Sequence, residues 1–218
     1  MEQLFSDKEL RALETQLSTP NGAMGIALGH NMHASNIGMT LATIALLKLE
    51  TGSTVLELGH GNCGHLDALM STAKDIEYHG LEVSQTMYEE ACKGNTHSNA
   101  TFAPYNGTDI PLPTASVASV FSVNTIYFWE KPSKLLREIE RVLKPGGRCI
   151  VTYANADFMK KLPFVRNKFK LYDTTRLQDL VASTQLRLEG IEERQESVLS
   201  KTGDRVQRLY TLAVMQKS

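Results

Sequence analysis

The sequence has few cysteines, no long hydrophobic run and no leader pattern at its start. Its three cysteines, Cys63, Cys92 and Cys149, form no CxxC pair, and an odd count argues against both a disulfide framework and a structural zinc site. The longest apolar stretch, 41–47, is interrupted by Thr43 and is far shorter than the ~20 residues that span a bilayer. The first residues carry no basic segment followed by an apolar one. These absences predict a cytoplasmic protein with reduced thiols and no bound metal.

The overall charge is nearly balanced, but its distribution along the chain is uneven. The 218 residues have a net charge of −1, with 42% hydrophobic and 22% charged residues. Up to Glu130 there are 5 basic against 14 acidic residues, and from Lys131 onward there are 18 against 10. The composition is that of one globular domain with an elaboration, or of two small domains. We expect no nucleic-acid partner and no membrane span, and the sequence leaves the oligomeric state open.

Hydrophobic periodicity divides the chain into a helical start and a series of alternating strands and helices. Ser6 and Glu9 have the spacing of a capping box, which predicts a helix over 7–17. Residues 18–35 show no clean period and predict a loop or a short helix, and a helical period then runs from 36 to about 50. Further helices are expected near 64–74, 85–93, 132–143 and 174–184. Strands are expected at 54–58, 76–82, 100–105, 117–123, 148–153, 186–198 and 205–215.

Strands that alternate with helices predict crossover connections, and hence a mostly parallel sheet with helices on both faces. The last two strands flank 201–204 and are expected to form a hairpin, so the last strand runs antiparallel. The predicted fold is a doubly wound, Rossmann-like α/β fold with a seven-stranded sheet. We divide the chain into an N-terminal helical cap or lid, 1–50, and a ligand-binding domain, 51–218. The methionines of the cap suit a surface that repacks around ligands.

The most informative segment is a glycine turn, VLELGHGNCGH at 55–65, between the first strand of the alternating series and the next helix. Such a turn holds nucleotide-containing ligands at the helix N-terminus. Two ligand classes compete for it. A dinucleotide would place its ribose on Glu82, at the end of the next strand. A phosphate-free ligand with a cationic amine, such as S-adenosylmethionine, is favoured by Glu57, because that carboxylate would repel a pyrophosphate and attract the amine.

Five successive segments resemble the motifs of class I S-adenosylmethionine-dependent methyltransferases. They are ELGHGN (57–62), GLEVS (80–84), NGTDIPLP (106–113), SVNTIYFW (122–129) and LLREIERVLKPGG (135–147). They are most similar to the methyltransferase type 11 group, a small-molecule branch that includes quinone-biosynthesis enzymes. The resemblance covers 53–153. It implies a transferase that uses S-adenosylmethionine, releases S-adenosylhomocysteine and binds the cofactor in its domain at 51–218.

The resemblance also implies which residues bind the cofactor. Glu57 would face the methionine amino group, Glu82 would accept hydrogen bonds from both ribose hydroxyls, and Val83 would lie against the adenine. Asn106 stands where the family often has Asp, and its amide keeps an acceptor oxygen for the adenine edge. The implied set is Glu57, Gly59, Gly61, Asn62, Glu82, Val83, Asn106, Gly107, Ser122 and Asn124.

The expected activity is methyl transfer to an unidentified small-molecule acceptor by direct displacement. The sequence does not identify catalytic residues. Tyr127, His33 and Tyr153 are candidates for a general base, which is needed only where the acceptor must lose a proton. Two other functions stay open: an NAD(P)-dependent oxidoreductase, in which Glu57 would be badly placed, and a non-catalytic module that binds S-adenosylmethionine.

A basic run without any acidic residue follows the fifth strand. It contains Lys160, Lys161, Arg166, Lys168 and Lys170. One interpretation is a solvated face. The other is that the run lies near the ligand-binding edge of the sheet and attracts an anionic acceptor.

Overall fold

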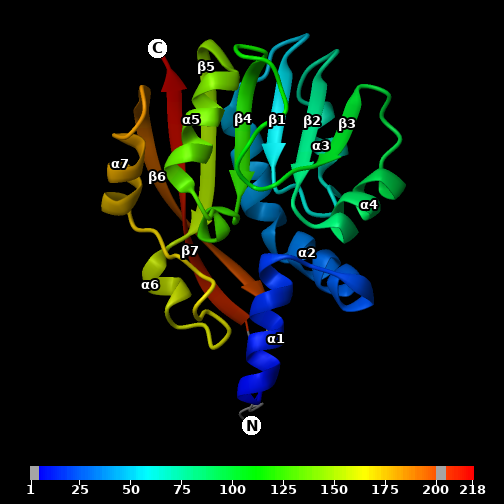
Figure 1. The fold of residues 1–218 in the computed structure, drawn as a ribbon, viewed down its shortest axis with the longest axis vertical. Coiled ribbons are helices and arrows are strands. Elements are labelled where there is room, and N and C mark those ends of the chain that lie inside the picture. Colours follow the sequence, from blue (N-terminus) through cyan, green and yellow to red (C-terminus); the bar gives the residue numbers. More distant parts are fainter. Residues whose placement is uncertain (1–4, 200–204) are drawn as a thin grey trace.

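The computed structural model describes residues 5–199 and 205–218, which form a seven-stranded sheet with helices on both faces (Figure 1). The helices are α1 (Asp7–Ser18), α2 (Gly22–Leu47), α3 (Leu66–Met70), α4 (Gln85–Gly94), α5 (Pro132–Val142), α6 (Ala156–Met159) and α7 (Thr174–Val181). The strands are β1 (Thr54–Leu58), β2 (Glu77–Glu82), β3 (Ala100–Pro104), β4 (Val117–Val123), β5 (Leu143–Ala154), β6 (Leu186–Leu199) and β7 (Arg205–Lys217). A short 3-10 helix, Ile126–Phe128, follows β4.

The strand order confirms the doubly wound fold. The sheet has the order β3-β2-β1-β4-β5-β7-β6, with β1 and β4 adjacent. Neighbours among β1 to β5 pair in parallel, and β7 runs antiparallel to both β5 and β6. The connections change direction between β1 and β4, which is where open α/β sheets leave a crevice at the carboxyl ends of their strands. The expected turn at 201–204 lies outside the described residues, and the strands beside it are paired.

Each face of the sheet is covered by helices. On one face, α5 buries a stripe of four residues and α7 packs beside it. The stripe consists of Leu135, Leu136, Ile139 and Val142, whose spacing places them on one side of the helix. Burying a side chain of this size contributes ~1.5–3 kcal/mol. The other face is covered by α3, α4 and the C-terminal half of α2.

The long helix α2 differs most from the sequence-based expectation. In place of a loop or short helix over 18–35, one helix continues to Leu47 and ends at Lys48, whose backbone is left-handed (φ 52°). The inward side of its N-terminal half carries small or polar residues such as Gly29 and His33, which line a cavity. The apolar period of a helix packed on a core is therefore missing from this half. No helix in the described residues, α2 included, is long and apolar enough to cross a membrane.

The start of α1 agrees with its local sequence signal, whereas the start of β5 does not. The capping box at α1 is confirmed, because the Glu9 N–H donates to Ser6 Oγ (3.3 Å) and the Ser6 N–H donates to the Glu9 carboxylate (2.8 Å). β5 begins earlier than expected, at Leu143, and its register shifts against β4 between Val117 and Ser119. Pro145, Gly146 and Gly147 therefore lie within this strand.

Segments from both ends of the chain form a layer below the carboxyl ends of the strands. Figure 1 shows α1, part of α2, α6 and the long ends of β6 and β7 in this region. The Lys168 N–H donates to the Glu14 carboxylate (2.7 Å), and Arg166 forms an ion pair with Asp7 (2.9 Å). These contacts hold α1 against the segment that follows α6.

Candidate active site

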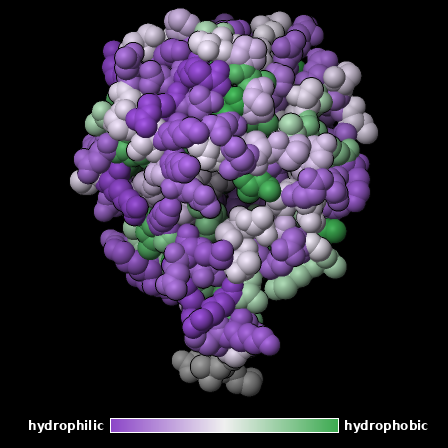
Figure 2. Space-filling model, in the orientation of Figure 1, coloured by the Kyte–Doolittle hydropathy of each residue, from purple (hydrophilic) through white to green (hydrophobic). Residues whose placement is uncertain are grey.

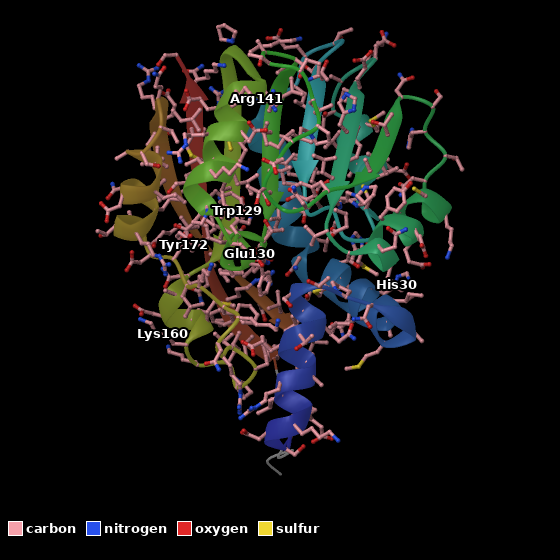
Figure 3. The ribbon with its side chains drawn as sticks, viewed as in Figure 1. His30, Trp129, Glu130, Arg141, Lys160 and Tyr172 are labelled. Carbon is pink, nitrogen blue, oxygen red and sulfur yellow. The ribbon has the colours of Figure 1, made fainter. Side chains whose placement is uncertain are left out.

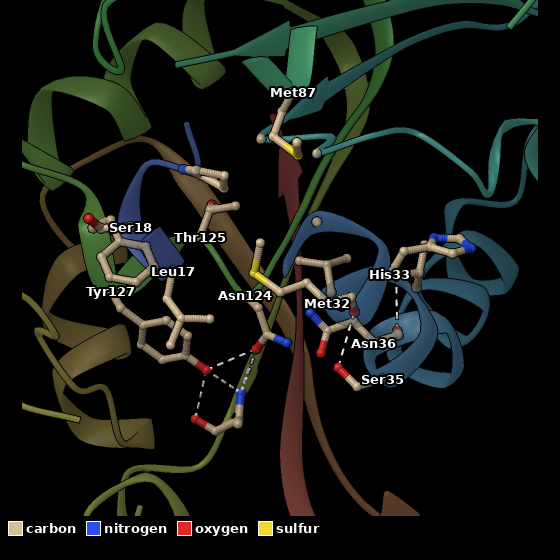
Figure 4. Close-up of a pocket in the computed structure, with 18 of the residues that line it drawn as sticks. Leu17, Ser18, Met32, His33, Ser35, Asn36, Met87, Asn124, Thr125 and Tyr127 are labelled. Atoms are coloured by element: carbon tan, nitrogen blue, oxygen red, sulfur yellow. Dashed lines mark hydrogen bonds between the residues drawn. The ribbon is translucent and has the colours of Figure 1, made fainter. Parts of the chain in front are cut away.

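A cavity lies at the carboxyl ends of β1, β2 and β4, where this topology places ligand sites. Its walls come from distant parts of the chain: the end of α1, the N-terminal half of α2, the glycine turn, the segment after β4, and the ends of β6 and β7. Figure 4 shows Leu17, Met32 and Asn36 of the N-terminal helices facing Asn124 and Tyr127 of the segment after β4.

The glycine turn after β1 is joined to the end of β2 by Glu82. Gly59 (φ 76°) and Gly61 (φ 58°) have left-handed backbones, which glycine adopts without steric cost. The Gly61 N–H donates to one Glu82 carboxylate oxygen, and the N–H groups of Val83 and Ser84 donate to the other, each at 2.9 Å. These hydrogen bonds fix the Glu82 carboxylate in the wall of the cavity.

Gly59 has no room for a side chain. A Cβ there would overlap the Cγ2 methyl group of Thr125. We expect Gly59→Ala to lower the free energy of unfolding by ~2–4 kcal/mol, measured by denaturant titration. Gly52→Ala is the matched control, because Gly52 has the same backbone conformation (φ 77°) but nothing within 4 Å of its Cβ position. Equal losses of unfolding free energy in the two variants would contradict a steric constraint at Gly59.

Glu57 is buried at the carboxyl end of β1 and accepts two hydrogen bonds. His65 Nε2 lies 2.8 Å from Glu57 Oε2, and the Tyr78 hydroxyl donates to the same oxygen. The Tyr78 hydroxyl also lies 3.3 Å from the sulfur of Cys63. No local sequence pattern predicts this cluster, because its members meet through the turn and a neighbouring strand.

The contact between Glu57 and His65 is a buried ion pair. Burial disfavours the charged form of each group, but their mutual attraction and hydrogen bond outweigh it, so the pKa of Glu57 is lowered and the pKa of His65 is raised. Burial and the negative charge of Glu57 raise the pKa of the Cys63 thiol well above its ordinary value. The thiol is therefore protonated at neutral pH.

The same cluster has the composition of a metal site. One potential ligand atom each from Glu57, Cys63 and His65 lies within 4.8 Å of the other two. A metal ion would have to displace the thiol proton and the hydrogen bonds that His65 and Tyr78 make to Glu57. The hydrogen bonds present both involve Glu57 Oε2 and describe an ion pair with His65.

The structure brings most of the cofactor residues implied by the resemblance into the cavity. Eight line it: Glu57, Gly59, Gly61, Asn62, Glu82, Val83, Gly107 and Asn124. Asn106 and Ser122 are not among the lining residues. The Asn106 amide oxygen accepts the N–H groups of Thr108 (2.9 Å) and Asp109 (2.8 Å), and Ser122 donates to the carbonyl of Leu58 (2.7 Å). The contacts of all ten residues with a cofactor stay predictions.

The two tyrosine candidates for a general base have strongly raised pKa values. Tyr127 lines the cavity, but its hydroxyl donates to the Asn124 amide oxygen (3.0 Å) and the Ala154 carbonyl (3.1 Å), and burial raises its pKa. Burial raises the pKa of Tyr153 to about 12, and this residue is not among those that line the cavity. Both phenols are protonated at neutral pH.

His33, the third candidate, lies on α2 and lines the cavity. Its ring stacks on His65 with 6.3 Å between centroids. Burial, together with the charges of His65 and His30, lowers its pKa. A neutral imidazole can accept a proton, so His33 is the candidate base that the geometry favours.

Several lining residues carried no signal in the sequence. Phe164, Phe169 and Arg208 line the cavity but lie outside all five motif segments. They reach the cavity because the segment after α6 and the hairpin of β6 and β7 extend below the sheet. No local pattern encodes that path.

Comparison with known proteins agrees with this geometry. A family model described as a methyltransferase domain matches residues 56–151. The chain is 30% identical over 124 residues to the uncharacterized methyltransferase YdaC of Bacillus subtilis, covering 57% of this chain and 68% of that protein. It is 29% identical over 107 residues to the 27-O-demethylrifamycin SV methyltransferase of Amycolatopsis mediterranei, but spans only 39% of that protein.

Solved structures share the fold. The YcgJ protein of Bacillus subtilis matches with a TM-score of 0.67 at 17% identity, over 83% of this chain and 98% of that chain. A phosphoethanolamine N-methyltransferase of Haemonchus contortus, solved with S-adenosylhomocysteine, matches with a TM-score of 0.67 at 16% identity, over 99% of this chain and 59% of that chain.

The fold is Rossmann-like, and its cavity lies at the carboxyl ends of the parallel strands. The chain belongs to the class I S-adenosylmethionine-dependent methyltransferase family. This confirms the family predicted from the five motif segments.

Proposed function

We propose that this protein transfers a methyl group from S-adenosylmethionine to a small-molecule acceptor. The observation that carries the proposal is the cavity end where Glu57, the glycine turn and Glu82 lie together. Glu82 and the pair of Glu57 with His65, with no lysine or arginine lining this end, suit a ligand with an ammonium group and ribose hydroxyls. A pyrophosphate would be repelled there, which argues against the nicotinamide-dependent alternative.

The residues of this cavity end fit the cofactor. Glu82 would accept hydrogen bonds from the two ribose hydroxyls, because backbone N–H groups already orient its carboxylate. Glu57 would bind the amino group, and Val83, whose side chain is exposed, would lie against the adenine. Gly61 leaves open space beside the turn, since a Cβ there would meet nothing within 4 Å. When bound, the cofactor supplies a methyl group on a positively charged sulfur.

The protein's part in the reaction is to orient the acceptor and exclude water. Holding the acceptor atom in line with the methyl group can supply ~7–11 kcal/mol through orientation. The hydrogen bonds of Tyr127 to Asn124 and Ala154 make the wall beyond β4 rigid (Figure 4). Where the acceptor must lose a proton, the neutral His33 imidazole would accept it.

Isothermal titration with S-adenosylhomocysteine tests the cofactor. We expect a dissociation constant on the order of micromolar and no binding heat with NADH or NADPH. Formation of S-adenosylhomocysteine from S-adenosylmethionine in the presence of an acceptor separates an enzyme from a binding module. Binding of a nicotinamide cofactor in its place would contradict the proposal.

We also propose that residues 1–50 act as a lid over the cofactor. Leu17, Ser18 and Pro20 at the end of α1 line the cavity, as does the N-terminal half of α2. The Ser84 hydroxyl donates to the Pro20 carbonyl, which ties this segment to the end of β2. The C-terminal half of α2 packs on the sheet, so the part able to open ends within α2.

Loosening α1 should speed the release of the cofactor product. Glu14 is buried and accepts the Lys168 N–H, so Glu14→Ala removes an anchor of α1. We expect the dissociation rate of S-adenosylhomocysteine to rise by about tenfold in stopped-flow measurements, because a hydrogen bond to a charged group is lost. Arg11→Ala is the control, since it breaks only an exposed pair with Asp7 on the same helix. An unchanged dissociation rate in Glu14→Ala would show that α1 is not part of the lid.

A further inference from the structure

One side of the cavity, which we call the aromatic half, has a wall of aromatic rings. Trp129 and Phe128 follow β4, and Phe164 and Phe169 come from the segment after α6. The rings pack on one another, with 4.7 Å between the centroids of Phe128 and Phe169 and 6.4 Å between those of Phe164 and Phe169. Aliphatic residues complete this wall: Leu17, Met159, Leu162, Val198, Leu199 and Val206.

The polar groups of this wall are already bonded within the protein. The Trp129 indole N–H donates to Thr125 Oγ1 (3.0 Å), and the Tyr127 hydroxyl is held as described above. Arg208 is the one lysine or arginine among the described residues that line the cavity. Its guanidinium pairs with Glu196 (2.7 Å) and donates to the Asn36 amide oxygen (2.8 Å) and the Ser35 carbonyl (2.7 Å). Its charge is therefore neutralised by Glu196.

The basic run that follows the fifth strand faces elsewhere. None of its five residues is among those that line the cavity. Lys160 pairs with Asp157 (2.9 Å), Arg166 pairs with Asp7 (2.9 Å), and Lys170 donates to the Trp129 carbonyl (3.2 Å). Figure 3 shows Lys160 at the outer side of α6, and Figure 2 shows a mostly hydrophilic surface on this face of the molecule. The basic run therefore lies outside the cavity.

We propose that the methyl acceptor is a neutral, largely apolar molecule that binds in the aromatic half of the cavity. The inference rests on the proposed function and names the chemical class of its acceptor. A carboxylate or phosphate placed in this half would be desolvated without a cationic partner, which is costly, whereas a ring or acyl chain gains by burial. The structure therefore favours a neutral acceptor over the anionic one that the basic run suggested.

The single tryptophan, Trp129, provides a direct binding signal, because it is buried in this wall. Protein saturated with S-adenosylhomocysteine is titrated with 1-decanol and with decanoate, which share one alkyl chain and differ in charge. We expect 1-decanol to change the Trp129 emission and to bind about tenfold or more tightly than decanoate. Equal or tighter binding of decanoate, or no response to either probe, would overturn the proposal.

A charge added at the rim gives a second, independent test. Leu199 lines the cavity with its side chain 56% exposed, so Leu199→Lys leaves the core intact. We expect this variant to bind decanoate at least about fivefold more tightly than the wild type, because the anion gains a partner. Met24→Lys is the control, as Met24 is equally exposed and is not among the lining residues. An equal gain in both variants would contradict an acceptor site at this rim.

The two proposals fail in different ways. If S-adenosylhomocysteine binds and 1-decanol does not, the neutral acceptor is wrong and the cofactor assignment stands. If S-adenosylhomocysteine itself does not bind, the methyltransferase function is wrong, and the acceptor assignment falls with it.

Discussion

Glu82→Ala should weaken the binding of S-adenosylhomocysteine by about 100-fold or more. The carboxylate would accept two ribose hydroxyls, and each hydrogen bond to a charged group is worth ~1.5–3 kcal/mol. The same substitution leaves the N–H groups of Gly61, Val83 and Ser84 without their acceptor, so the glycine turn also loses its anchor. Isothermal titration of the variant against the wild type measures the effect.

Two companion variants separate binding from folding. Glu77→Ala removes a carboxylate from the exposed start of the same strand, and its affinity should match the wild type. Glu82→Gln keeps one acceptor oxygen and should retain intermediate affinity. A Glu82→Ala protein that unfolds at the wild-type temperature and still binds S-adenosylhomocysteine normally would disprove the role of Glu82.

His65→Ala should destabilise the protein by ~3–5 kcal/mol, because it leaves the buried Glu57 carboxylate without its cationic partner. Denaturant unfolding near pH 6 is the measurement. His97→Ala is the control, since His97 also contacts a carboxylate, Asp67, at 2.6 Å, but that carboxylate is 93% exposed. Exposed pairs of this kind contribute little, so the control should unfold like the wild type.

The destabilisation should depend on pH in a defined direction. His65 has its pKa raised above 6.5, so its contribution to stability is complete below pH 6.5 and is lost as the pH rises through the folded-state value. Glu57 has its pKa lowered below 4.5, so its contribution is present above pH 4.5 and is lost as the pH falls through the folded-state value. The difference in the free energy of unfolding between the wild type and His65→Ala should therefore be largest between about pH 4.5 and 6.5. A difference that does not change from pH 5.5 to pH 9 would contradict a charged pair.

The ion pair also bears on the cofactor. Glu57 carries the negative charge that would attract the amino group, and His65 already neutralises part of it. As His65 loses its proton at higher pH, the attraction of Glu57 for a cationic amine should increase. We therefore expect S-adenosylhomocysteine, whose amine is charged near neutral pH, to bind more tightly at pH 8 than at pH 6.

Local patterns in the sequence determined the succession of strands and helices, the glycine turn and the two acids at the strand ends. These features follow from residues that are neighbours along the chain: alternation marks a strand, a 3.6-residue period marks α5, and left-handed backbones call for Gly59 and Gly61. The N-terminal half of α2 escaped prediction because its inward side borders a cavity rather than a core. At Gly29 this half of α2 lies close to the Met87 side chain of α4.

Only the tertiary structure decided how the cavity is closed and what it can hold. The contacts that matter join residues far apart in the sequence, such as Asp7 with Arg166 and Asn36 with Arg208. Within the basic run, Arg166 pairs with Asp7 and Lys160 pairs with Asp157, and none of the five residues of the run lines the cavity. Charge along a chain is fixed by composition, but the charge that a ligand meets depends on which partners folding places beside it.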